Sequence, residues 1–152
     1  MTVKLHLLYG TETGTAEFLC DDMKDAMDDG VECKISNMED VDPATLDGDV
    51  LNVLVSSTFG SGEVPGSAQP FYDKLVKNKP DLSHVRFAMF GLGDRTFDMT
   101  FNQGSEKIME AMLACSAKQV GERGIFDASS PDMPEDIAIP WLQGILADEA
   151  VA

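Results

Sequence analysis

The stretch Leu7–Leu19, LLYGTETGTAEFL, joins an apolar segment to the start of a helical pattern through a turn of glycines and hydroxyls. Thr11, Thr13 and Thr15 supply hydroxyl donors, and Gly14 lets the backbone approach a ligand closely. The first N–H groups of a helix are unpaired and attract anions. No lysine or arginine stands in the turn. We therefore expect neutral dipoles to hold a dianionic monophosphate here.

Two familiar nucleotide-binding motifs are absent from this turn. A P-loop requires GxxxxGK[ST], and a dinucleotide-binding turn requires GxGxxG. A purely structural alternative stays open, in which Thr13 only caps the helix. Capping and phosphate binding are compatible with each other.

Short apolar segments alternate with helical patterns along the whole chain. The helical patterns cover 16–27, 71–76, 108–113 and 137–145, and Pro140 is expected to bend or delay the last one. Such alternation predicts an α/β fold, a three-layer sandwich in which helices cover both faces of a five-stranded parallel sheet. The expected strands are Val3–Leu8, Val31–Ile35, Val50–Val55, Val85–Phe90 and, more weakly, Lys118–Val120.

Composition limits the classes of partner. The chain has 152 residues, a hydrophobic fraction of 43% and a formal net charge of −16, which predicts one folded domain and argues against nucleic acid as a partner. The charge either keeps the protein soluble or attracts a basic partner. Cys20, Cys33 and Cys115 show no metal-binding spacing and are expected as core residues, with no metal site. No signal peptide or membrane segment is evident, so we expect a cytoplasmic protein.

Three loops of similar chemistry follow the first, third and fourth strands: GTETGTAE, SSTFGSGEVPG and GLGDRTFDMTFNQG. In a parallel sheet these loops meet beyond the carboxyl ends of the strands, where ligands bind. Phe59 and Phe97 stand beside glycines in the second and third loops. Two aromatic rings across one crevice favour a stacked, flat ligand, although burial of each in a small local core is the alternative.

These loops resemble those of a known family. TETGTAE, SSTFGSGEVPGSAQPFYDKL and FGLGDRTF resemble the flavodoxins and the FMN domains of diflavin reductases. PFYDKLVKNKPDLSHVRFAMFGLGDR, SAKQVGE and PDMPED are most similar to the small MioC-type flavodoxins. The resemblance implies a single domain over residues 1–152, a sheet of order 2-1-3-4-5, noncovalent FMN, and electron transfer between redox proteins.

The resemblance also implies the cofactor-binding residues. The phosphate loop corresponds to Thr11, Glu12, Thr13, Gly14, Thr15 and Ala16. The loop over one flavin face corresponds to Ser57, Thr58, Phe59, Gly60 and Gly62. The loop over the other face corresponds to Gly91, Leu92, Gly93, Asp94, Phe97, Phe101 and Asn102. Phe97 stands where the family usually has tyrosine, and DMTFN is one residue longer than the related pattern.

No catalytic side chain is needed for this function, because FMN itself carries the redox chemistry. We expect that burying an anionic reduced flavin near Glu63, Asp94 and Asp98 lowers the potential of its second electron, and that the carbonyl of a turned Gly60 peptide accepts a hydrogen bond from the protonated ring nitrogen of the one-electron-reduced flavin. We expect a monomeric electron carrier rather than an enzyme. Its partners would be a basic-surfaced reductase, such as a flavodoxin reductase, and an acceptor protein. The acidic surface expected to attract them lies in or beside the predicted flavin edge and comprises Glu12, Asp21, Asp22, Glu63, Asp94 and Asp98.

Three alternatives differ in function class. A phosphorelay receiver needs an aspartate after the third strand, where the chain has Val55, Ser56 and Ser57, so that class is excluded. An FMN-dependent NAD(P)H:quinone or nitro-compound reductase remains open. So does a binding module that has lost FMN, although Phe59 and the intact threonine loop argue against it.

Overall fold

The computed structural model describes residues 3–11, 14–27, 30–57, 64–93, 103–127 and 129–151. Its strands are β1 (Val3–Gly10), β2 (Val31–Asn37), β3 (Leu51–Ser57), β4 (Arg86–Gly93), β5 (Lys118–Gln119) and β6 (Gly124–Asp127). Its α-helices are α1 (Thr15–Asp25), α2 (Gln69–Asn78), α3 (Gln103–Ala114) and α4 (Pro134–Val151). Two short 3-10 helices, η1 (Met38–Asp40) and η2 (Pro43–Thr45), connect β2 to β3.

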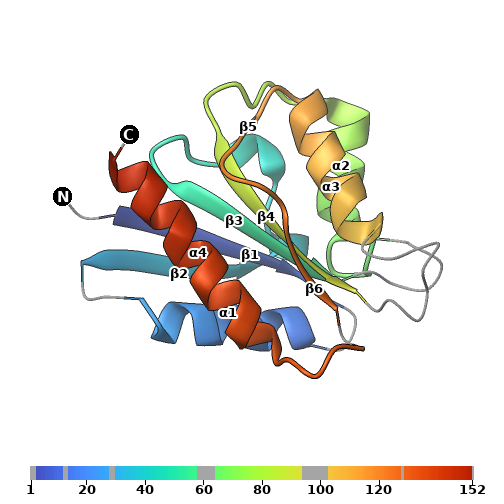
Figure 1. Ribbon diagram of the computed structural model, residues 1–152. Coiled ribbons are helices and arrows are strands. Elements are labelled where there is room, and N and C mark those ends of the chain that lie inside the picture. The colour runs from blue at the N-terminus through green and yellow to red at the C-terminus, as the bar shows by residue number, and fades with distance from the viewer. Residues whose placement is uncertain are drawn as a thin grey trace.

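The strands form one parallel sheet in the order β2-β1-β3-β4-β5, with β6 also paired to β4. Figure 1 shows α1 and α4 on one face of the sheet and α2 and α3 on the other. The predicted α/β sandwich and the order 2-1-3-4-5 are both confirmed.

The side chains of each strand pack alternately in two separate hydrophobic cores, because successive side chains of a strand point to opposite faces of the sheet. Leu5 and Leu7 of β1 pack on the α1/α4 side, whereas Leu8 packs on the α2/α3 side. The central strands are apolar on both faces, which explains why β3 and β4 read as continuous apolar runs. β2 pairs only with β1 among the described strands, and its burial alternates as expected for an edge strand.

The fifth position of the sheet differs from the prediction. The expected strand Lys118–Val120 is β5, which ends at Gln119, and a second segment, β6, was not predicted. Gln119 pairs with Phe87 and Gly124 pairs with Phe90, so three steps along β4 correspond to five along the edge. The two additional residues lie in a widened segment of four residues, Val120–Arg123, between β5 and β6.

The last helix also differs from the prediction. Pro140 does not delay α4, which begins at Pro134 and has Pro140 in its interior. Pro134 suits the first helical position, where a missing N–H costs nothing, whereas Pro140 removes one hydrogen bond inside the helix. Core packing of Ala138, Leu142 and Ile145 offsets that loss. Three apolar residues of the predicted helical patterns are exposed instead of buried: Val76, Leu113 and Ile137.

Candidate functional site

The sheet register brings the three predicted loops to one edge. Gly10 at the end of β1 pairs with Ser56, and Ser57 at the end of β3 pairs with Leu92 of β4. Gly93, the last residue of β4, pairs with Asp127 of β6. The ends of β1, β3 and β4, from which the three predicted loops begin, therefore lie side by side at the carboxyl edge of the sheet.

The turn after β1 places a helix N-terminus at this edge. Gly14 is the N-cap of α1 and has φ 95°, a left-handed conformation that side chains other than glycine adopt only with strain. Its N–H donates to Thr11 Oγ1 at 2.8 Å, and its carbonyl accepts the first helical hydrogen bond, from Phe18 N at 3.0 Å. Within the described ranges, no acceptor meets the N–H groups of Thr15 and Ala16. These unpaired donors suit a phosphate group.

A second contact ties this turn to the segment that follows the β3 loop. The Thr11 N–H donates to Ser67 Oγ at 2.7 Å, and the Ser67 N–H donates to the Thr11 carbonyl at 3.4 Å. Ser57 Oγ donates to the Gly10 carbonyl at 3.4 Å. The phosphate turn is thus held by main-chain and hydroxyl groups from both sides.

Close packing under the turn requires glycine at position 10. A Cβ added there would lie 2.5 Å from Ala68 Cβ and 3.3 Å from Ser56 Oγ. Ala68 is fully buried immediately before α2, so it has no room to move. The close approach of β1 to the start of α2 thereby fixes the direction in which the chain enters the phosphate turn.

The structure describes part of the predicted cofactor-binding set. It brings eight of those residues to the carboxyl edge: Thr11, Gly14, Thr15, Ala16, Ser57, Gly91, Leu92 and Gly93. The others lie outside the described residues: Glu12, Thr13, Thr58, Phe59, Gly60, Gly62, Asp94, Phe97, Phe101 and Asn102. The assignment of both groups to FMN stays a prediction. Ser67 was not predicted, because its role depends on a backbone contact 56 residues away.

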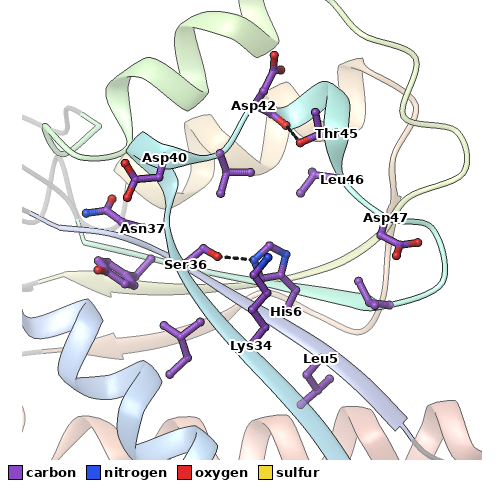
Figure 2. Close-up of a pocket in the computed structure, with 14 residues that line it drawn as sticks. Leu5, His6, Lys34, Ser36, Asn37, Asp40, Asp42, Thr45, Leu46 and Asp47 are labelled. Atoms are coloured by element: carbon purple, nitrogen blue, oxygen red, sulfur yellow. Dashed lines mark hydrogen bonds between the residues drawn. The ribbon is translucent and has the colours of Figure 1, made fainter.

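A polar pocket of about 620 Å³ lies between β1, β2 and the η1–η2 segment. Figure 2 shows His6 and Lys34 at its centre, with a hydrogen bond between His6 Nε2 and Ser36 Oγ at 2.8 Å. Burial, and to a lesser degree the charge of Lys34, lower the pKa of His6, while the nearby Asn52 side chain opposes this shift. His6 is therefore a half-buried histidine whose ring is hydrogen-bonded to Ser36 and whose pKa lies below the ordinary value for histidine.

The family model described as flavodoxin matches residues 7–141 of this chain. The chain belongs to the flavodoxin family. The matched range covers all three loops of the candidate site. This family membership supports FMN as a noncovalent cofactor, as the sequence resemblance implies.

Relatives of this chain include both small proteins and parts of larger ones. MioC of Escherichia coli strain K12 is 41% identical over 90 residues, which cover 59% of this chain and 60% of that protein. Pyruvate dehydrogenase (NADP(+)) of Cryptosporidium parvum is 34% identical over 94% of this chain but only 8% of that protein. The MioC homologue of Haemophilus influenzae is 29% identical over 141 residues, which cover 92% of this chain and 94% of that protein. The chain thus spans less than two thirds of several relatives.

Solved structures agree with the flavodoxin fold. A mutant of flavodoxin from Pseudomonas aeruginosa has a TM-score of 0.79 at 27% identity, covering 95% of this chain and 97% of that one. Oxidised Flavodoxin 2 from Bacillus cereus also has a TM-score of 0.79, at 25% identity, covering 96% and 99%.

The outer face of α1 in this flavodoxin carries part of the predicted acidic surface. Asp21 and Asp22 are both exposed there, about two turns beyond the phosphate turn. The other acidic residues predicted at the flavin edge, Glu12, Glu63, Asp94 and Asp98, lie outside the described residues. Among the helices that the structure describes, none is both long and apolar enough to cross a membrane.

Proposed function

We propose that residues 1–152 form a single FMN-binding domain that carries electrons from a reductase to an acceptor protein. The observation that carries this proposal is the glycine-capped N-terminus of α1, which has no lysine or arginine and follows the turn after β1 in a chain of the flavodoxin family. Unpaired N–H donors at this point suit a monophosphate, and FMN has one.

The phosphate end would be held by backbone dipoles and hydroxyls. The N–H groups of Thr15 and Ala16 would donate to phosphate oxygens, aided by the threonine hydroxyls of the turn. Gly14 keeps the backbone open at the point of closest approach. Thr11 and Ser67 hold the turn in place through their paired hydrogen bonds.

The ring end would lie between the loops that leave β3 and β4. Phe59 and Phe97 would contact its two faces, and the neighbouring glycines would leave backbone groups free to read its edge. Ser57 and Gly93, at the ends of the two strands, set where these loops begin. When bound, FMN supplies the capacity to accept and release single electrons.

Partner selection would come from charge. The net charge of −16 and the exposed Asp21 and Asp22 on the helix that follows the phosphate turn favour a partner with a basic surface. Attraction at distance would orient that partner toward the flavin edge before contact. The same proposal places the protein in the cytoplasm as a monomer.

Electron relay through the flavin-loaded protein tests the proposal. A flavodoxin reductase would be mixed with NADPH and cytochrome c, with and without the holoprotein. We expect the holoprotein to accelerate cytochrome c reduction, and the acceleration to fall as salt is raised. An unchanged rate would contradict the relay. Rapid NAD(P)H oxidation by the holoprotein and a quinone alone would instead favour the reductase alternative.

A further inference from the structure

The loop between β4 and α3 carries Phe97, one of the two phenylalanines predicted to contact the flavin ring, and the residues that flank the loop lie in the described part of the chain. It leaves the sheet at Gly93, which is fixed by pairing with Asp127. It returns at Gln103, the first residue of α3. The position of the first turn of α3 therefore sets the span that the loop must bridge.

That first turn has no large apolar anchor. The buried residues of α3 are Gly104, Ser105, Ile108 and Met112. Ile108 and Met112 hold the middle of the helix in the core, whereas the first turn buries only two small residues. Its position consequently depends on polar contacts more than on apolar packing.

Arg123 supplies such a contact from the segment that joins β5 to β6. Its Nη1 donates to Ser105 Oγ at 3.0 Å, and Ser105 is fully buried. A hydrogen bond with a charged donor is about twice as strong as a neutral one. Arg123 itself is half-buried, which protects the contact from water.

The widened segment holds Arg123 in place for this contact. Trp141 Nε1 of α4 donates to the Glu122 carbonyl at 3.1 Å. Gly121 has φ 71°, and a Cβ added there would meet Ile145 Cγ1 at 3.1 Å. The segment is thus tied to α4 on one face of the sheet, while Arg123 reaches the first turn of α3 on the other.

We propose that Arg123 is a positioning residue for the flavin ring. By holding Ser105, it fixes the first turn of α3, where the chain returns from the segment predicted to contact the ring, and so favours ring binding. Arg123 acts on the ring end of the ligand and not on the phosphate. This inference rests on the proposed function, since it presupposes FMN at the site.

Comparing the affinity for FMN with that for riboflavin, which lacks the phosphate, distinguishes an effect on ring binding from an effect on phosphate binding. We expect Arg123→Gln and Ser105→Ala each to weaken both ligands by roughly three- to thirtyfold. The ratio of the two affinities should stay as in the wild type, and visible circular dichroism of the bound flavin should change. Lys118→Gln, which removes an exposed charge at the same sheet edge, should change neither affinity.

Ser105→Ala shows whether Arg123 acts through its hydrogen bond to Ser105 or through its charge alone, because this change removes the acceptor and leaves the Arg123 charge in place. If Ser105→Ala binds both flavins as the wild type does, while Arg123→Gln binds them weakly, Arg123 acts through its field and the positioning role is wrong. In the double variant the losses should be less than additive, since both changes remove one contact. If Arg123→Gln fails to fold, the flavin affinities of Ser105→Ala alone still confirm or overturn the positioning role. Wild-type protein that binds neither flavin would overturn the proposed function itself.

Discussion

Thr11 and Ser67 exchange two hydrogen bonds, one from the Thr11 N–H to Ser67 Oγ at 2.7 Å and one from the Ser67 N–H to the Thr11 carbonyl at 3.4 Å. They join the phosphate turn after β1 to the segment before α2. Two segments that are distant in sequence are therefore held together. This connection gives the candidate site a base that does not depend on charged residues.

Removing the Ser67 hydroxyl should loosen the phosphate turn. Ser67→Ala deletes the acceptor of the shorter bond and keeps the backbone bond, so we expect a loss of about 0.5–1.5 kcal/mol in FMN binding, or roughly two- to twelvefold. Quenching of FMN fluorescence on titration measures this. Ser83→Ala, at an exposed serine far along the sequence, is the control. Equal affinities in the two variants would contradict the role of Ser67.

Gly14→Ala should weaken FMN binding selectively. At φ 95° an alanine costs about 1–2 kcal/mol, and relief of that strain moves the backbone away from the phosphate. FMN affinity should fall by about tenfold, whereas riboflavin affinity should change by less than about twofold. Gly30→Ala, where an added Cβ meets nothing within 4 Å, is the matched control. An equal loss for both ligands would show that Gly14 serves the fold and not the phosphate.

Gly124→Ala should destabilise the whole fold. An added Cβ would lie 2.5 Å from Phe90 Cδ2 and 2.8 Å from Trp141 Nε1, in a region without free volume. Overpacking of this kind costs about 1–3 kcal/mol of unfolding free energy. Trp141 is the sole tryptophan, so its fluorescence reports urea unfolding directly. Gly144→Ala, an open helical position, should leave stability equal or slightly higher.

His6 should make stability depend on pH. Burial lowers its pKa in the folded protein below the ordinary value of about 6.5, so the unfolded chain takes up the proton more readily. The part of the unfolding free energy that depends on a neutral His6 is fully present above about pH 6.5 and is lost as the pH falls toward the pKa of His6 in the folded protein. Urea unfolding at pH 7.5 and 5.5 should show a smaller difference in His6→Gln than in the wild type. His84→Asn, at the exposed histidine, should keep the wild-type difference.

The sequence was most informative where burial covers both faces of an element. β3 and β4 are buried on both sides, so their continuous apolar runs allow only one interpretation, and their order and direction follow from the short crossovers. The convergence of three loops follows from parallel pairing alone. Gly14 was also predicted to matter, because a glycine in such a turn lets the backbone approach a ligand closely.

Other features depend on contacts that no local pattern contains. β6 has only four residues and begins with Gly124, so its sequence alone does not predict a strand. It forms because Gly124 fits closely against Phe90 of β4. Pro140 suggested a bent or delayed helix, yet α4 begins before it and tolerates it because neighbouring turns of the helix pack in the core. The Arg123–Ser105 contact joins residues 18 positions apart through a widening of the edge strand. Such a widening depends on register, which single-residue preferences do not determine.

Calorimetric titration of the flavin-free protein with FMN, beside the same titration with riboflavin, tests the central claim most directly. We expect one FMN per chain at micromolar affinity or better, with riboflavin bound measurably more weakly because the N-terminus of α1 holds the phosphate. No heat of binding with FMN, or riboflavin bound as tightly as FMN, would contradict it.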